Sequence, residues 1–172
     1  CYEKPILLWG NGIVMGGGLG LMAGASHRVV TETSRIAMPE LTIGLYPDVG
    51  GSYFLHKMPE QVGLFLGLTA ASINAEDALF VNLADHYATA DKYDAIFTAI
   101  TAEKWGKTAS LNHEKLTNIL ISIDNISGRV PKGNVKDNLA VIQKLAEFDS
   151  LQGKIDYIQA LETEDKWLTR AQ

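Results

Sequence analysis

The first part of the chain alternates short apolar runs with glycine-rich turns. Ile6–Trp9 is an apolar run bounded by proline and glycine, which predicts a buried strand. Leu19–Ala25 holds only small and apolar residues and predicts a helix that packs close to its neighbours. Two further short strands are expected at Arg28–Thr31 and Arg35–Ala37, with a turn between them. Together these elements predict a mixed α/β fold.

The remainder of the pattern is mainly helical. An irregular segment follows residue 37 and ends at Gly50-Gly51, and Pro59 is expected to begin an apolar helix. Asn74 is a candidate N-cap with Asp77 at the capping-box position, for a helix that runs to about Asn82. Beyond residue 91, helical periodicity occurs at 92–104, 111–123, 135–147 and 151–161.

Glycine is distributed unevenly along the chain. Twelve of the sixteen glycines lie between Gly10 and Gly67. We therefore expect residues 1–90 to form a core that carries the site, and residues 91–172 to form a helical region. The chain opens without a methionine or polar leader and stops within a helical pattern. We expect it to be part of a longer protein.

Composition restricts the class of protein. The 172 residues suffice for one domain, and 47% apolar with 20% charged residues is typical of a globular chain. A net charge of −5 without a basic cluster argues against a nucleic-acid surface, and no apolar run is long enough for a membrane helix. The single cysteine, Cys1, cannot form an internal disulfide, which fits a reducing compartment. The four histidines show no metal-ligand spacing.

The three consecutive glycines at 16–18 are the first candidate site. Between a strand and a helix, they permit backbone conformations closed to other residues and leave amide N–H groups open to a ligand. Unpaired donors at a helix N-terminus favour negative charge, so a developing oxyanion could be held there. The alternative is a tight turn with close helix packing, and the glycines alone do not separate the two.

Other motifs are weaker. Gly18-Leu-Gly20-Leu-Met-Ala23 matches the dinucleotide pattern G-x-G-x-x-A, with Glu40 about twenty residues on, but eight residues separate it from the predicted strand. No Gly-Lys-Ser/Thr follows the glycines, which excludes a phosphate-binding P-loop. Ser52 and His56 are spaced for one face of a helix, but nothing else supports a catalytic triad.

Two carboxylates complete the candidate set. Glu40 follows a short apolar strand directly and is fixed by Pro39, a placement suited to proton transfer, although an isolated Glu is more often an exposed cap. Asp48 stands between Pro47 and two glycines, which by itself is ordinary turn chemistry.

The three blocks Gly12–Leu21, Ala37–Glu40 and Ile43–Gly51 together resemble the enoyl-CoA hydratase/isomerase (crotonase) superfamily, and within it the 3-hydroxyisobutyryl-CoA hydrolase branch. The strong resemblance covers about residues 4–90. It implies a crotonase fold of repeated ββα turns, here lacking its N-terminal part and followed by a helical region. It also implies that a thioester carbonyl is bound between two backbone N–H groups, one of them in the glycine run at Gly17, next to Gly16.

The resemblance assigns roles to the carboxylates. Hydratases of this superfamily carry a glutamate at the position of Gly20 and a glycine at that of Asp48, whereas the combination here resembles the hydroxyacyl-CoA hydrolases. Glu40 is then expected to act as nucleophile or general base, and Asp48 to bind the substrate hydroxyl or to position water. The segment with the other oxyanion N–H is expected before Cys1, so the chain alone is expected to be inactive.

The resemblance thus implies an acyl-CoA thioester hydrolase of valine breakdown. CoA enters as part of the substrate, so no separate cofactor is expected, and a homo-oligomer is compatible with the superfamily. The expected location is cytoplasmic in a bacterium and the mitochondrial matrix in a eukaryote. Two alternatives stay open: a hydratase or isomerase acting on another acyl-CoA, and a binding or scaffold module without activity.

Overall fold

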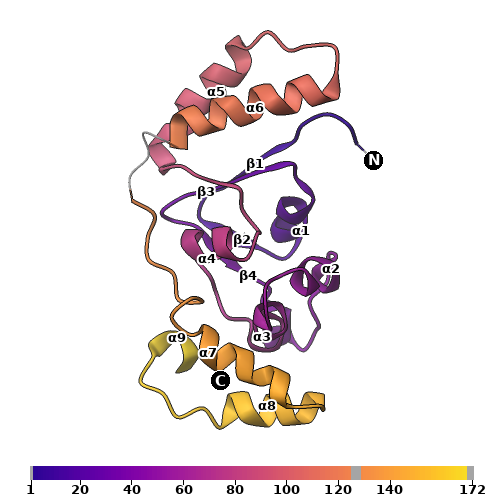
Figure 1. Cartoon of the computed structure of the whole chain (residues 1–172), viewed down its shortest axis with the longest axis vertical. Helices are drawn as coiled ribbons and strands as arrows, with labels where there is room; N and C mark the ends of the chain where they lie inside the picture. Colours follow the sequence, from indigo (N-terminus) through magenta and orange to yellow (C-terminus); the bar gives the residue numbers. More distant parts are fainter. Residues whose placement is uncertain (1, 125–128, 170–172) are drawn as a thin grey trace.

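The computed structural model describes residues 2–124 and 129–169, so Cys1 lies outside the described residues. Its core contains two successive units (Figure 1). The first unit has two strands followed by a helix, and the second begins with another two strands. The elements of these two units are β1 (Leu7–Gly10), β2 (Ile13–Met15), α1 (Gly17–Gly24), β3 (His27–Val30) and β4 (Arg35–Ala37).

Equivalent strands of the two units pair in parallel. Leu7 of β1 is in register with His27 of β3, and Ile13 of β2 is in register with Arg35 of β4. A short third strand, β5 (His86–Tyr87), adds to the other side of β3, which gives the order β1-β3-β5. The chain therefore stacks successive ββα turns on one another.

Polar side chains hold the corners of these turns together. The Oδ1 atom of Asn11, between β1 and β2, accepts hydrogen bonds from the hydroxyls of Thr31 and Thr33 at 2.9 and 2.7 Å. The Ser34 hydroxyl donates to the carbonyl of Gly10 at 2.5 Å. Because these bonds link the β1–β2 corner to the β3–β4 corner, they fix how one turn lies on the next.

Helices follow β4. A 3-10 helix, η1, comes first and is followed by three short α-helices that cover the lower part of the strands in Figure 1. The later helices lie at the two ends of the molecule, α5 and α6 beside β1 and β3, and α7 to α9 beside α3. The bounds are η1 (Pro39–Ile43), α2 (Gly51–His56), α3 (Val62–Thr69), α4 (Ala75–Phe80), η2 (Ala90–Lys92), α5 (Tyr93–Ala102), α6 (Ala109–Asp124), α7 (Leu139–Gln143), η3 (Lys144–Glu147), α8 (Leu151–Gln159) and α9 (Lys166–Thr169).

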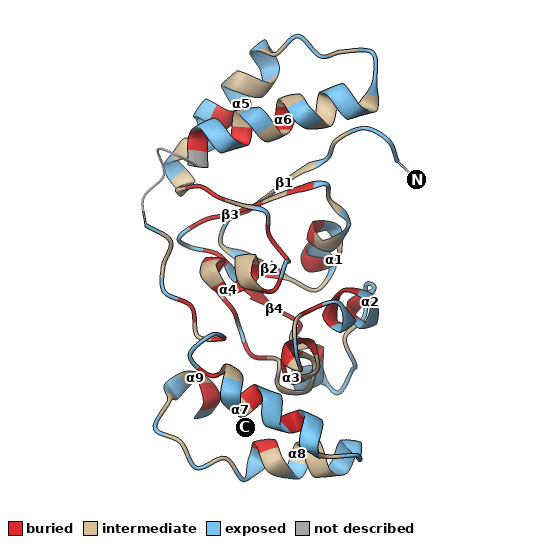
Figure 2. Ribbon diagram, viewed as in Figure 1, coloured by how far each residue is buried: buried red, intermediate tan, exposed pale blue. Residues whose placement is uncertain are grey.

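Two apolar clusters form the interior, and Figure 2 colours buried residues red on both strands and helices. The main cluster includes Met22 of α1 and Phe65 of α3 and extends to Ile142 of α7. The second cluster joins Val29 of β3 to Leu120 of α6. The terminal helices are thus packed against the core at both ends. The expected boundary near residue 90 stays a prediction.

Most predicted elements are confirmed, and the differences have local causes. The α4 helix begins with the predicted capping box, because the Asn74 side chain accepts from the Asp77 N–H and Asp77 accepts in return. It ends at Phe80 rather than Asn82, whose φ of 59° is left-handed. The α3 helix starts at Val62 rather than Pro59, since Glu60 also has a positive φ.

Short elements were missed. The strands β2 and β5 have three and two residues, too few for a period to be visible in the sequence. The segment expected to be irregular contains η1, and α2 begins at its last glycine, Gly51, with Gly50 as the N-cap. The predicted helix at 135–147 is helical only from Leu139. Within the described ranges, no helix has the length and apolarity needed to cross a membrane.

Candidate active site

The N-terminus of α1 carries the glycine run. Gly16 is the N-cap with φ 51° and ψ −126°, a conformation that favours glycine, and Gly17 is the first helical residue. The N–H groups of Leu19 and Gly20 both donate to the Gly16 carbonyl, at 3.0 and 3.1 Å. The Gly17 and Gly18 N–H groups have no hydrogen-bond partner within residues 2–124 and 129–169. Two free donors therefore stand at the positive end of this helix.

The space in front of these donors is open. A Cβ atom built on Gly17 or Gly18 would meet no other atom within 4 Å. A ligand oxygen can therefore approach the two amides without displacing a side chain. This is the arrangement expected of an anion or oxyanion site, and a tight turn with close packing at these glycines would not leave such space.

Glu40 lies in η1, which the local sequence places directly after β4. Pro39 occupies the first turn of η1, where its missing N–H is not needed, and Gly44 ends it with a left-handed φ of 76°. The Glu40 residue is only 7% exposed. Its Oε2 atom is buried and has no hydrogen-bond partner among the described residues. A buried carboxylate oxygen without a donor is costly to fold, which points to a functional role.

The glycine run and Glu40 lie together. A Cβ on Gly16 would be 3.6 Å from Oε1 of Glu40, so the carboxylate adjoins the N-cap of α1. The structure thus brings together the Glu40 carboxylate and the free N–H groups of the first helical turn. Such a pair can hold a developing negative charge on one atom while a carboxylate attacks or removes a proton beside it.

Asp48 is placed differently. Its side chain is exposed and makes no hydrogen bond with the described residues. Its carbonyl accepts from the Gly51 N–H at 2.6 Å, closing a turn in which Val49 and Gly50 both have positive φ, 44° and 83°. A β-branched residue in this region is an outlier that costs about 1–3 kcal/mol. The turn nevertheless packs on α1, because a Cβ on Gly20 would meet Val49 Cβ at 2.8 Å.

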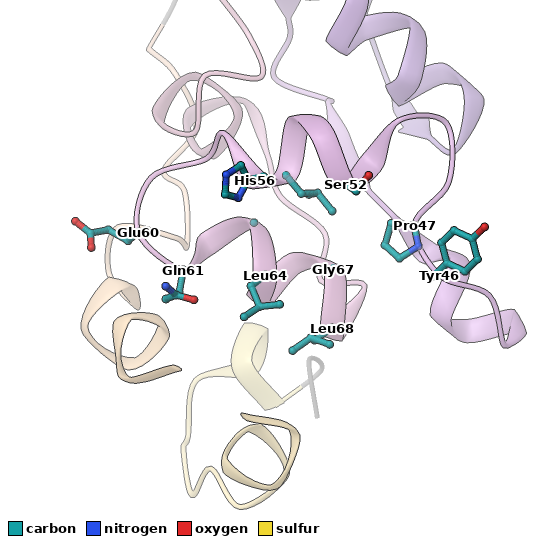
Figure 3. A pocket seen from close by; sticks show the side chains of 11 residues that line it. Tyr46, Pro47, Ser52, His56, Glu60, Gln61, Leu64, Gly67 and Leu68 are labelled. Atoms are coloured by element: carbon teal, nitrogen blue, oxygen red, sulfur yellow. The ribbon is translucent and has the colours of Figure 1, made fainter. Parts of the chain in front are cut away.

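A cavity of about 570 Å³ opens between α2 and α3, beside Pro47 (Figure 3). Its floor is apolar, and Ser52, His56 and Glu60 contribute polar groups. Ser52 and His56 project from α2, but no hydrogen bond joins them in the described chain, and Glu60 points away in Figure 3. The three residues are therefore no triad. Sequence reasoning noted the helical spacing of Ser52 and His56 but did not predict the cavity, because its other wall is formed by α3.

The dinucleotide alternative needs a correction. A strand does lead directly into this region, since β2 ends at Met15, so the objection based on eight intervening residues is wrong. Gly18 and Gly20, however, lie inside α1 and not in the turn before it. The tight-turn geometry of that fingerprint is therefore absent. Within the described ranges, no group of three or more His, Cys, Asp or Glu side chains could hold a metal ion.

Comparison with known proteins shows the family and the fold. A family model described as enoyl-CoA hydratase/isomerase matches residues 1–172. The crystal structure of a carnitinyl-CoA dehydratase from Mycobacterium thermoresistibile superposes with a TM-score of 0.81 at 31% identity, covering 99% of this chain and 46% of that one. The expected crotonase fold of stacked ββα turns is confirmed by this superposition.

Two curated relatives differ in role. Mitochondrial 3-hydroxyisobutyryl-CoA hydrolase of Danio rerio is 44% identical over 95 residues, 55% of this chain and 25% of that protein. Small ribosomal subunit protein mS47 of Neurospora crassa is 38% identical over 130 residues, 76% of this chain and 25% of that protein. The chain spans about a quarter of the length of these relatives. Its match to the family model over its whole length is decisive: the chain belongs to the enoyl-CoA hydratase/isomerase family.

Proposed function

We propose that the protein containing this chain hydrolyses an acyl-CoA thioester whose acyl group carries a 3-hydroxyl, such as 3-hydroxyisobutyryl-CoA. The observation that carries this proposal is the buried Glu40 carboxylate, with one oxygen unpartnered in the described chain, beside the free N–H groups of α1. The similarity to a 3-hydroxyisobutyryl-CoA hydrolase supports the choice of acyl group.

In this proposal the thioester carbonyl oxygen lies at the N-terminus of α1. The Gly17 N–H donates to it and stabilises the negative charge that develops when the carbonyl carbon is attacked. A single preorganised donor of this kind contributes about 3–4 kcal/mol to lowering the barrier. The open space in front of Gly17 admits the carbonyl without rearrangement.

Glu40 supplies the reacting carboxylate by one of two routes. As general base it takes a proton from water, the water oxygen bonds to the carbonyl carbon, and the C–S bond breaks to release the CoA thiol, which receives the proton. As nucleophile its oxygen bonds to the carbonyl carbon, and CoA leaves as a thiol after taking up a proton. Water then attacks the Glu40 carbonyl carbon of the resulting anhydride, which releases the acid and restores the carboxylate. A single turnover in ¹⁸O-labelled water separates the routes, because only the nucleophilic route leaves the first product unlabelled.

Asp48 is proposed to accept a hydrogen bond from the 3-hydroxyl of the acyl group. Its exposed carboxylate is not engaged by any described residue and is free to bind a polar substrate group. Binding of this hydroxyl would favour 3-hydroxyacyl thioesters over acyl thioesters without the hydroxyl. With the latter, the Asp48 carboxylate would lose contact with water without gaining a hydrogen bond, which weakens binding.

The second oxyanion donor is proposed to come from a segment outside these 172 residues. The chain covers only a quarter of its curated relatives, and apolar side chains are exposed around the site. Contiguous exposed apolar surface of this kind marks an interface. We propose that the rest of the enzyme covers it. The exposed side chains lie on β2, α1, η1 and the following loop: Ile13, Leu21, Leu41, Ile43, Leu45, Tyr46 and Val49.

The test is made in the full-length protein. Wild type is expected to release CoA from 3-hydroxyisobutyryl-CoA, measured with a thiol reagent, and Glu40→Gln is expected to lower kcat by about 10²–10⁴-fold. Asp94→Asn, an exposed carboxylate on α5, is the matched control and should retain full turnover. Unchanged CoA release by Glu40→Gln would remove the basis of the proposal.

Two other functions have support from particular relatives. The similarity to a carnitinyl-CoA dehydratase favours hydration or dehydration chemistry with Glu40. Incubation with crotonyl-CoA decides this, because hydration without release of CoA identifies a hydratase. The similarity to a ribosomal protein favours a scaffold without turnover. In that case neither substrate reacts, and sedimentation of the full-length protein with small ribosomal subunits identifies the role.

A further inference from the structure

We propose that Gly20 and Val49 act as a pair of positioning residues for Asp48. Their contact sets where the turn at residues 48–51 lies on α1 and therefore where the Asp48 carboxylate stands relative to Glu40. The expected effect on catalysis rests on the proposed thioesterase function. The contact between Gly20 and Val49 is observed in the structure and does not depend on that function.

The contact is close and involves both side chain and backbone. A Cβ built on Gly20 would lie 2.8 Å from Val49 Cβ, 3.0 Å from its Cγ2 and 3.0 Å from its carbonyl oxygen. Real Cβ atoms do not come this close to other atoms, so only glycine at position 20 allows the turn to lie where it does. Val49 at the same time has a φ of 44°, which β-branched residues avoid. Val49, with its unfavourable φ, is thus packed against Gly20, which has no side chain.

The contact lies on the face of α1 that carries the site. Gly20 follows Gly16 by four residues, which places both on one side of the helix, about 6 Å apart along its axis. Gly16 adjoins the Glu40 carboxylate. The turn that starts with Asp48 therefore packs one helical turn away from Glu40, on the same side of α1.

On the other side of Asp48, Pro47 lies close to Gly51 of α2 and Gly67 of α3, so the turn is held on two sides. The Asp48 side chain makes no hydrogen bond with the described residues, and its carbonyl is bonded only within the turn, to the Gly51 N–H. The position of the Asp48 carboxylate relative to α1 therefore depends on the packing of Val49 on Gly20. The same contact excludes any side chain from position 20.

The experiment uses the full-length protein and CoA release from 3-hydroxyisobutyryl-CoA. Gly20→Ala is expected to lower kcat/KM by at least tenfold, because the new methyl group displaces the turn. Adding Val49→Gly should recover most of this loss, since it removes the side-chain contacts and suits the positive φ. Gly24→Ala is the matched control, because it adds a methyl group to the same helix where no atom lies within 4 Å, and should change kcat/KM by less than twofold.

Dependence on Asp48 separates positioning from a general structural effect. In an Asp48→Asn background, Gly20→Ala is expected to cause no further loss of kcat/KM. An equal loss in both backgrounds, or no recovery with Val49→Gly, would overturn the proposal. Thermal unfolding of the same variants measures the contact without activity: Gly20→Ala and Val49→Gly should be non-additive in Tm, and additive shifts contradict the contact. If wild type releases no CoA, the proposed function fails while this coupling is still measured.

Discussion

At the scale of single residues, the site is defined as much by missing side chains as by present ones. Gly16 adopts a backbone conformation that other residues avoid, Gly17 leaves its N–H open, and Gly20 admits the neighbouring turn. Each glycine is required for a different reason, and a sequence that shows only a glycine run does not separate them. The one large functional side chain among them is Glu40, held buried against Gly16.

This difference predicts opposite outcomes for two neighbouring substitutions. Gly16→Ala should lower the free energy of unfolding by about 1–3 kcal/mol, because alanine must adopt φ 51° and ψ −126°. Gly17→Ala should leave stability unchanged or slightly raised, since it is a helical position with open space around Cβ. Its methyl group should instead hinder a ligand oxygen from reaching the N–H and lower kcat/KM. Chemical denaturation and CoA release measure the two effects; equal stability of the two variants contradicts the assignment.

At the scale of elements, His27 links strand β3 to helix α6. Its Nε2 atom lies 3.0 Å from the Thr117 hydroxyl, and its Nδ1 atom lies 2.9 Å from that of Ser26. The Thr117 hydroxyl donates its proton to the His113 carbonyl, so it can accept a hydrogen bond from Nε2–H. Burial, and next the nearby His113, lower the pKa of His27 below its ordinary value of 6.5. Burial thus favours the uncharged form of the His27 ring.

A dependence of stability on pH follows. As pH falls below about 6.5, the unfolded chain takes up a proton at His27 before the folded chain does, so the free energy of unfolding decreases. Wild type should therefore have a lower Tm at pH 5.5 than at pH 7.5, and His27→Gln should reduce this difference. His56→Gln, an exposed histidine on α2, is the control. An undiminished difference in His27→Gln would assign the effect to other groups.

At the scale of the whole molecule, the two apolar clusters connect different numbers of helices and strands. The main cluster runs from α1 through α3 to α7, and so connects the site to the C-terminal helices. The second cluster holds α5 and α6 against β3 and β1. Because the second cluster involves fewer elements, α5 and α6 should open as a unit before the core does.

Hydrogen exchange tests this difference. Leu120→Ala removes a side chain 2% exposed in the second cluster and should lower protection of α5 and α6 by about 2–5 kcal/mol, leaving α3 amides unchanged. Met22→Ala in the main cluster should lower protection in α1 and α3 as well. Uniform loss of protection across the chain in Leu120→Ala would show instead that the molecule unfolds as one unit.

The sequence alone determined the local features of this protein. Apolar runs and helical periodicity located most helices and three of the five strands found in the described residues. The Asn74 capping box could be predicted because its partners are three residues apart. The glycine run, Glu40 and Asp48 were found because their spacing resembles one family. These signals depend on neighbours within a few residues, which a sequence displays directly.

Only the tertiary structure decided how these pieces meet. Glu40 lies beside Gly16, Val49 packs on Gly20, and His27 bonds to Thr117, and each pair is separated by more than twenty residues. The short strands β2 and β5 form because parallel partners are already in place to receive them. Such contacts depend on which surfaces fit together after the chain has folded back on itself. Hydrophobic periodicity and local propensity report on neighbours along the chain, so they do not predict these contacts.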